Sequence, residues 1–159
     1  MRIHNVHERT LPIDAQAAWT LVDSLGTPDD RLWPRGGWPR MKREGDSAHH
    51  AFVRYRVVGR EPGRSLRFRF RDMPGFAGEH AFEVIPAGDG ASVLRHTMIA
   101  DAQGRIELAW RLCIRRLHDA LLEDLLDGAE GRPPRAHGPL VRAARIIGAS
   151  VRRLPYRSV

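Results

Sequence analysis

The segment SLRFRF at residues 65 to 70 alternates between apolar and charged side chains without a break. A β-strand has a period of two, so Leu66, Phe68 and Phe70 share one face while the arginines between them share the other. These arginines are therefore expected on the solvent-exposed face of an antiparallel strand and not in a nucleic-acid-binding patch. A sheet of this kind folds only if another element covers its apolar face.

The same alternation precedes this segment. In FVRYRVVG, from residue 52, Val53, Tyr55 and Val57 share one face, and EPGR at residues 61 to 64 predicts the turn between the two strands. Tyr55 is the only tyrosine before the C-terminal tail, and its alternation predicts a phenol that points inward. Its hydroxyl then needs a partner or a ligand, although ordinary core packing is the alternative interpretation.

A hairpin follows. Residues 79–86 and 91–100 flank the turn residues Gly88, Asp89 and Gly90, a typical hairpin signal. Pairing about Asp89 sets Glu83 opposite Arg95, as a cross-strand pair of opposite charge. The same register gathers the other face of the hairpin: His80, Phe82, Val84, Leu94, His96 and Met98.

Helical patterns lie on both sides of these strands. Residues 2–11 predict an opening strand, and Asp14 is placed to cap a short helix that ends at Gly26. Residues 31–46, with Trp33 and Trp38, are rich in Gly and Pro and predict a loop with one short strand at most. A long amphipathic helix is expected from about residue 105 to 127, with an apolar stripe formed by Trp110, Ile114, Leu117, Leu121 and Leu125.

The length and the charge distribution limit the classes of protein. The chain of 159 residues suits one domain, with a formal net charge of +7. Residues 1–127 hold 19 Lys and Arg against 18 Asp and Glu, whereas residues 128–159 hold 7 Arg against Glu130 alone. The folded body is thus close to neutral and shows no nucleic-acid recognition motif, so no nucleic-acid partner is expected. The alternatives for the basic tail are a solvated segment and a dedicated anion-binding element.

Other classes are disfavoured by what the sequence lacks. A single cysteine, Cys113, can supply neither an internal disulfide nor a cysteine-rich zinc site. No HExxH motif appears, and His49 and His50 are adjacent loop residues that point apart, so no metal site and no cofactor are expected. The start of the chain has no apolar stretch typical of a secretory signal, and a cytoplasmic location is the default expectation.

The tail has one further pattern, a basic amphipathic helix expected within residues 140–154. Its alternatives are contact with an anionic membrane surface or a partner, and packing on the protein's own sheet or on a second subunit as a homodimer. We favour packing. The expected apolar sector consists of Leu140, Ala144, Ile147, Val151 and Leu154, and the opposite side carries Arg142, Arg145, Arg152 and Arg153.

The order of strand, helix, antiparallel strands and long C-terminal helix resembles the START-like (SRPBCC) superfamily, which includes polyketide cyclases and lipid-transfer domains. The segments that carry the resemblance are PIDAQAAWTLVDSL, RYRVVGREPGRSLRFRF, GEHAFEVIPAGDGASVLRHT and LHDALLEDLL. It covers roughly residues 3 to 127. The resemblance implies an α+β helix-grip fold, in which a curved antiparallel sheet wraps around the long C-terminal helix with a cavity between them. We therefore expect a helix-grip domain at residues 1–127 and a basic C-terminal extension at residues 128–159.

Two functions follow for such a cavity. The first is binding of a small hydrophobic, lipid-like or polyketide-like molecule, with no catalysis. The alternative is an enzyme of polyketide cyclase or dehydratase type, which we rank lower because Glu79 and Glu83 fall on the outer face and no inward carboxylate is visible to orient a histidine. The catalytic residues are unknown. The candidate ligand-binding residues are Tyr55, Phe68, Phe70, His80, Phe82, His96, Met98, Trp110, Ile114 and His118.

The histidines of this set are its most informative members. His80 and His96 are expected on the inward face of the hairpin, and His118 lies beside the apolar stripe of the long helix. Together they would form a polar cluster that orients a ligand's oxygen atoms. For each one alone, the alternative is a partly buried histidine whose hydrogen bonds a neighbouring group satisfies.

Overall fold

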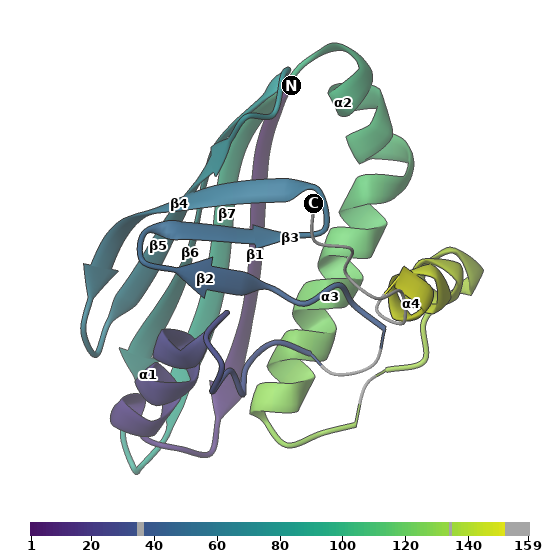
Figure 1. Cartoon of the computed structure of the whole chain (residues 1–159). Helices are drawn as coiled ribbons and strands as arrows, with labels where there is room; N and C mark the ends of the chain where they lie inside the picture. Colours follow the sequence, from purple (N-terminus) through teal and green to yellow (C-terminus); the bar gives the residue numbers. More distant parts are fainter. Residues whose placement is uncertain (35–36, 134, 152–159) are drawn as a thin grey trace.

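One curved antiparallel sheet wraps around a long C-terminal helix (Figure 1). The structure is a computed structural model, and it describes residues 1–34, 37–133 and 135–151, with side chains as far as residue 146. The sheet order is β1-β7-β6-β5-β4-β3-β2. Its strands are β1 (Arg2–Leu11), β2 (Lys42–Glu44), β3 (Ser47–His50), β4 (Val53–Glu61), β5 (Ser65–Arg71), β6 (Phe76–Pro86) and β7 (Ser92–Ala102).

The long helix is continuous but not uniform. It consists of α2 (Gly104–Ala109), a π-helical turn η1 (Trp110–Ile114) and α3 (Arg115–Ala129). The expected end at residue 127 is two residues early, since the helix passes through Gly128 and its C-cap is Glu130. The π-helical turn, which sequence periodicity does not show, is a local widening often found at functional sites.

The two remaining helices lie at different edges of this assembly. Helix α1 (Ala15–Ser24) is capped as expected, with the Asp14 carboxylate accepting a hydrogen bond from the amide of Ala17 at 2.7 Å. It covers one end of the sheet, against β5, β6 and β7. Helix α4 (Pro139–Val151) packs on the outside of α3 (Figure 1).

The expected strand register is confirmed. Glu83 lies opposite Arg95, and the apolar face of β5 points inward, with Leu66 and Phe68 fully buried. One detail differs, because the guanidinium of Arg95 donates to the carboxylate of Glu8 on β1, at 2.8 Å. The charge pair therefore forms with the neighbouring strand on the other side and not within the hairpin.

Two expected boundaries were wrong. The loop between α1 and β4 contains two short strands, so His49 and His50 lie on β3 and not in a loop. Strand β6 begins at Phe76, three residues before the expected start, because the turn after β5 is shorter than the segment DMPGFAG suggested. Phe76 is buried and packs with Trp110 in a second core cluster at that end of the sheet.

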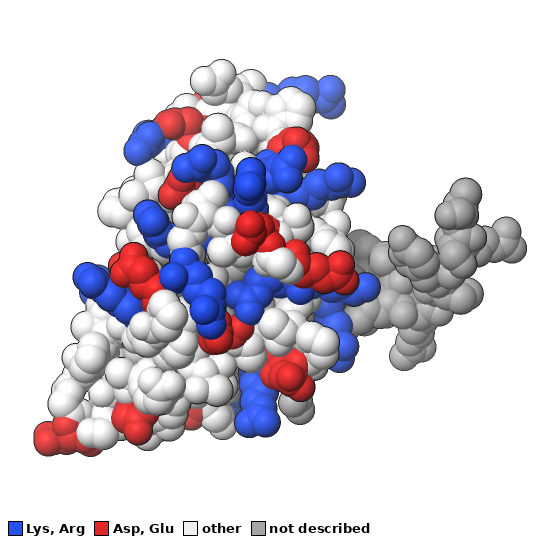
Figure 2. All heavy atoms as spheres, turned by 60° about the vertical axis from the view of Figure 1, so that its left-hand side comes forward, with Lys and Arg blue, Asp and Glu red and all other residues white. Residues whose placement is uncertain are grey.

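The tail is attached to the body. Arg132, Arg135 and Arg145 lie within ion-pair distance of Glu130, Asp127 and Asp124 respectively. These three arginines thus pair with carboxylates of α3 or its C-cap. Acidic and basic side chains are also interspersed over the face seen in Figure 2.

The inward face of α4 differs from the expected one. Val141 is buried against Leu121, whereas Leu140 is exposed and Arg145 turns toward Asp124. The expected positions 147 and 151–154 lie outside the residues whose side chains are described. Among the described helices, none is both long and apolar enough to cross a membrane.

Candidate functional site

A cavity of about 340 Å³ lies between the sheet and the long helix. Strands β3 to β7 supply one wall, α2, η1 and α3 supply the opposite wall, and the loop with Trp33 and Trp38 supplies a side. Among the described residues that line it, not one is Asp, Glu, Lys or Arg. Its polar members are one tyrosine and four histidines, namely Tyr55, His50, His80, His96 and His118.

The structure brings nine of the ten candidate residues to the cavity wall. These are Tyr55, Phe70, His80, Phe82, His96, Met98, Trp110, Ile114 and His118. The tenth, Phe68, is fully buried and does not line the cavity. Its ring stacks on that of His80, with centroids 5.0 Å apart, so it supports the wall from within the core.

The π-helical turn shapes the helical wall. It spans Trp110 to Ile114, and both of these terminal residues line the cavity. Two more lining residues, Leu117 and Leu121, follow on α3. The apolar stripe expected from sequence therefore faces the cavity along most of its length, while Leu125 lies in the main core.

His80 and His96 form a buried pair on β6 and β7. The Nδ1 atom of His80 lies 3.1 Å from the Nε2 atom of His96. The other nitrogen of each ring is buried and has no hydrogen-bond partner among the described residues. Burial lowers the pKa of His80 to about 3 and that of His96 well below its usual value, so both imidazoles are neutral near pH 7.

Tyr55 is paired with His50, which is not among the ligand-binding residues predicted from the sequence. Its hydroxyl lies 3.0 Å from Nδ1 of His50, and the two rings stack with centroids 5.4 Å apart. Burial lowers the pKa of His50 to about 4, so this imidazole is also neutral. Alternation along SAHH, which sets His50 opposite Val53 on β4, is the signal that would have found it.

A row of polar contacts between β1 and α3, called the polar seam below, was also not predicted from the sequence. It consists of Asn5, His7 and Arg9 on β1 and Asp119, Glu123 and Asp127 on α3. Alternation on β1 points Asn5, His7 and Arg9 toward the helix, and acidic residues of α3 face them at helical spacing. His7 Nδ1 lies 2.8 Å from a Glu123 carboxylate oxygen, and His7 Nε2 lies 3.2 Å from Asp119 Oδ1. The hydrogen bonds with Asp119 and Glu123 raise the pKa of His7 against the opposing effect of burial.

The polar seam bears on one premise of the sequence analysis. His118 lines the cavity, and its Nδ1 lies 3.7 Å from Oδ1 of Asp119. Burial lowers the pKa of His118, and the neighbouring Asp119 opposes that shift. The expectation that no inward carboxylate is present holds for the described cavity wall, which has no Asp or Glu, but Asp119 of α3 stands beside His118 without lining the cavity.

Asp124 ties three segments together beside the cavity. Its fully buried carboxylate accepts hydrogen bonds from the indole N–H of Trp38 at 2.8 Å and from Nε2 of His137 at 2.7 Å. Arg145 of α4 lies 3.7 Å from the same carboxylate. Ala144, one residue earlier on α4, lines the cavity, so the tail forms part of the site.

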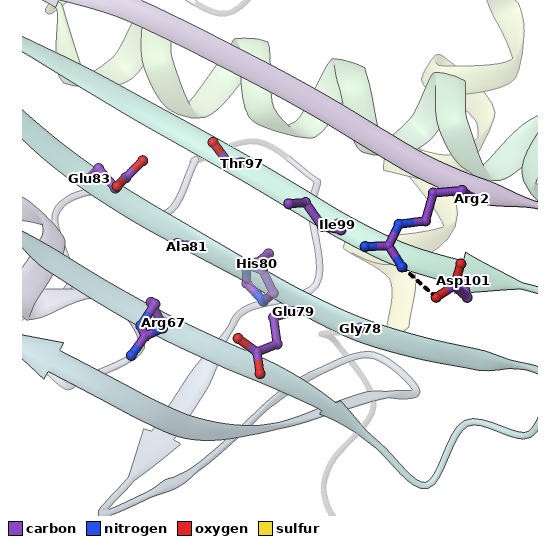
Figure 3. A pocket seen from close by; sticks show the side chains of 10 residues that line it. All are labelled: Arg2, Arg67, Gly78, Glu79, His80, Ala81, Glu83, Thr97, Ile99 and Asp101. Carbon is purple, nitrogen blue, oxygen red and sulfur yellow. Dashed lines mark hydrogen bonds and ion pairs between the residues drawn. The ribbon is translucent and has the colours of Figure 1, made fainter.

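The outer face of the sheet carries a second, open depression of about 440 Å³ (Figure 3). It lies over Gly78, which has no side chain, and Ala81, which has a small one, so space is left between longer neighbours. Three of the charged residues that line it are in ion pairs across strands, namely Arg2 with Asp101 (dashed in Figure 3) and Glu79 with Arg69. This depression is shallow and exposed, and the enclosed cavity is the candidate site.

Neither protein-family models nor curated proteins match this chain. Solved structures, in contrast, do match this chain. Norcoclaurine synthase from Thalictrum flavum is 12% identical, with a TM-score of 0.61 over 82% of this chain and 86% of that chain. An uncharacterised protein from Bacillus thuringiensis is 14% identical (TM-score 0.58, 80% and 98% covered), and a protein from Thermobifida fusca is 18% identical (TM-score 0.58, 84% and 99% covered). The chain thus shares the helix-grip fold of these solved structures.

Proposed function

We propose that this protein binds one small, uncharged, largely hydrophobic molecule in the cavity between the sheet and the long helix. The observation that carries the proposal is the composition of the cavity wall. Apart from the hydroxyl of Tyr55 and four histidines, the described wall consists of apolar aromatic and aliphatic side chains. Burial of apolar ligand surface in such a cavity is favourable by roughly 25 cal/mol per Å² before the costs of association. A charged ligand would lose its hydration without gaining a countercharge from this wall.

The histidine pair indicates the polar part of the ligand. Both imidazoles are neutral, so in either tautomer one ring of the His80–His96 pair donates to the other. One N–H and one lone pair then remain on the two outer nitrogens, without a partner among the described residues. A ligand that carries a hydroxyl or carbonyl oxygen supplies the complementary group after a small movement of the rings.

The fold comparison supports a ligand of this size. Norcoclaurine synthase from Thalictrum flavum, which shares the fold, has been solved in complex with dopamine and hydroxybenzaldehyde. A protein of this architecture thus holds small aromatic molecules. A cavity of about 340 Å³ falls at the lower end of the range found for small-molecule sites, about 300–1,000 Å³.

Two substitutions on the same helical turn test the proposal. Ile114→Trp adds a large side chain at the cavity wall, whereas Leu112→Trp adds the same side chain at a position that is 61% exposed. The uncharged fluorescent probe N-phenyl-1-naphthylamine is titrated into each purified protein, and native mass spectrometry records any co-purified molecule. We expect Ile114→Trp to weaken probe binding at least about tenfold and Leu112→Trp to leave it unchanged. Equal binding by both variants would contradict a role for this cavity.

A second candidate is an enzyme of polyketide cyclase type, and Asp119 beside His118 favours it. In this reaction a histidine of the cavity takes a proton from a terminal methyl carbon of a linear triketone, which then bonds to the distal carbonyl carbon. Loss of one water from the resulting alcohol gives a phenol. Heptane-2,4,6-trione is the probe, and NMR distinguishes the phenol product from the isomeric pyrone. Acceleration by the protein that disappears in His118→Gln would support catalysis, and no acceleration would leave binding alone as the function.

A further inference from the structure

Three potential metal ligands meet at the junction of β1 and α3, beside the cavity. They are His7, His118 and Asp119, each of which offers one ligand atom, and these atoms lie within 4.8 Å of one another. The Asp119 oxygen is 3.2 Å from the His7 nitrogen and 3.7 Å from the His118 nitrogen. From this convergence we propose that His7, His118 and Asp119 bind one divalent transition-metal ion of the Zn²⁺ type.

The two separations from Asp119 Oδ1 suit a tetrahedral ion. Bonds of 2.0–2.1 Å to nitrogen and oxygen place neighbouring ligand atoms about 3.3 Å apart around Zn²⁺. The two separations from Asp119 Oδ1 lie on either side of this value. Two imidazoles and one carboxylate make a donor set that suits zinc and its neighbours, whereas Ca²⁺ and Mg²⁺ prefer sites built from oxygen alone. Three protein ligands also leave the fourth position of the ion open.

The groups around these ligands match the surroundings of a metal site. A ligating histidine usually donates its second N–H to a carboxylate, which fixes its tautomer and orientation. Glu123 stands in that position, 2.8 Å from Nδ1 of His7. The side-chain amide of Asn5 donates to Asp119 Oδ1 at 2.9 Å and fixes the carboxylate.

The neighbouring arginines do not occupy the site. Arg9 donates to the Oε2 atom of Glu123, while His7 meets Oε1. Arg115 lies 3.6 Å from Oδ2 of Asp119, on the oxygen that does not face the two histidines. Each carboxylate therefore uses one oxygen for an arginine and turns the other toward His7.

An unpartnered nitrogen atom of His118 is a second observation that points to a bound ion. Its Nδ1 atom is buried and has no hydrogen-bond partner among the described residues, although a carboxylate oxygen stands 3.7 Å away. A buried imidazole nitrogen without a partner is costly, and a metal ion would satisfy it directly. A metal on Nδ1 also leaves the proton on Nε2, so the ion would fix the tautomer that His118 presents to the cavity.

Isothermal titration of the full chain with ZnCl₂ tests the proposal. We expect one ion per chain, and repetition in buffers of different ionisation enthalpy is expected to show proton release, since the ligand atoms must be deprotonated to bind the ion. The variants His118→Ala and Asp119→Asn are expected to bind at least about tenfold more weakly. His4→Asn, which removes an exposed histidine of the same strand, is the control for adventitious surface binding and is expected to bind as the wild type does.

A spectroscopic measurement covers the case in which a ligand variant does not fold. Co²⁺ in the wild-type chain is expected to give the intense visible bands of a four-coordinate site, and Zn²⁺ is expected to abolish them. Glu123→Gln leaves the three ligands in place and is expected to weaken binding by about 10- to 100-fold. Absence of a stoichiometric ion, octahedral cobalt bands, or equal affinity in wild type and His118→Ala would each overturn the proposal, whatever the cavity binds.

Discussion

The Nδ1 atom of His80 and the Nε2 atom of His96 lie 3.1 Å apart on adjacent strands, in the buried wall of the cavity. The two rings belong to one face of a hairpin whose register places His80 beside Met98 and Phe82 beside His96. Each ring is the only hydrogen-bond partner of the other among the described residues. The contribution of each imidazole to the stability of the folded protein therefore depends on the presence of the other.

A double-mutant cycle measures this dependence. His80→Phe or His96→Phe alone leaves the remaining imidazole buried without a partner, and each is expected to lower the free energy of unfolding by about 1–3 kcal/mol. The double variant removes both polar rings and is expected to cost clearly less than the sum of the two single changes. Urea denaturation monitored by circular dichroism gives the three values. Additive losses would show that the two rings act independently.

The buried histidines predict a loss of stability in mild acid. Burial lowers the pKa of His50 to about 4 and that of His80 to about 3, against about 6.5 in the unfolded chain. Below pH 6.5 the unfolded state binds more protons than the folded state, so the free energy of unfolding falls as the pH falls from 6.5 toward 4. For His50 alone the loss by pH 4.5 is about 2 kcal/mol. Urea midpoints measured between pH 7.5 and 4.5 check this slope.

Two substitutions on neighbouring residues isolate the contribution of His50. In His50→Asn the amide group still faces the Tyr55 hydroxyl but does not titrate, so the variant is expected to lose less stability in acid than the wild type. His49→Asn, on the exposed side of the same strand, is the matched control and is expected to follow the wild-type curve. Identical slopes for all three proteins would refute the assignment to His50.

Asp124 predicts how the tail is held. Its carboxylate is fully buried and contacts Trp38, His137 and Arg145, so Asp124→Ala leaves these groups without their shared partner. We expect a loss of about 3 kcal/mol in the free energy of unfolding and faster tryptic cleavage after Arg135 in the native protein. Asp101→Ala, which breaks the exposed pair with Arg2, is the control and is expected to cost less than 1 kcal/mol. Unchanged cleavage in Asp124→Ala would show that the tail is held without Asp124, by the Arg135–Asp127 pair and its apolar contacts.

Two glycines with nearly the same φ allow the cost of backbone strain to be distinguished from the cost of a steric clash with an added Cβ atom. Gly26 (φ +77°) and Gly63 (φ +79°) both adopt the left-handed region that favours glycine. A Cβ atom on Gly26 would lie 2.9 Å from the Cβ of Arg43, whereas one on Gly63 would meet nothing within 4 Å. Gly63→Ala is thus expected to cost about 1 kcal/mol and Gly26→Ala at least 1 kcal/mol more. Thermal unfolding compares the two, and equal losses would exclude crowding at the end of α1.

The candidate site was only partly predictable. Period-two alternation found the inward positions on β4 to β7, and helical periodicity found the stripe that includes Trp110 and Ile114. Phe68 shows the limit of alternation, which indicates the buried face of a strand but not which part of that face is filled by core packing and which part borders a cavity. His50 was missed because the four-residue strand that carries it was expected to be a loop, so its alternation was not applied.

The amino-acid sequence by itself determined the local elements, the strand register of the hairpin and the side of each strand that turns inward. These depend on periods of two or 3.6 residues, on turn residues and on an N-cap, all of which act over a few neighbouring positions. Only the tertiary structure decided that His7 of the first strand meets Asp119 and His118 of the last long helix, and that Asp124 joins the Trp38 loop to α4. Such contacts depend on the curvature of the whole sheet around the helix, and no local pattern records which residues this curvature brings together.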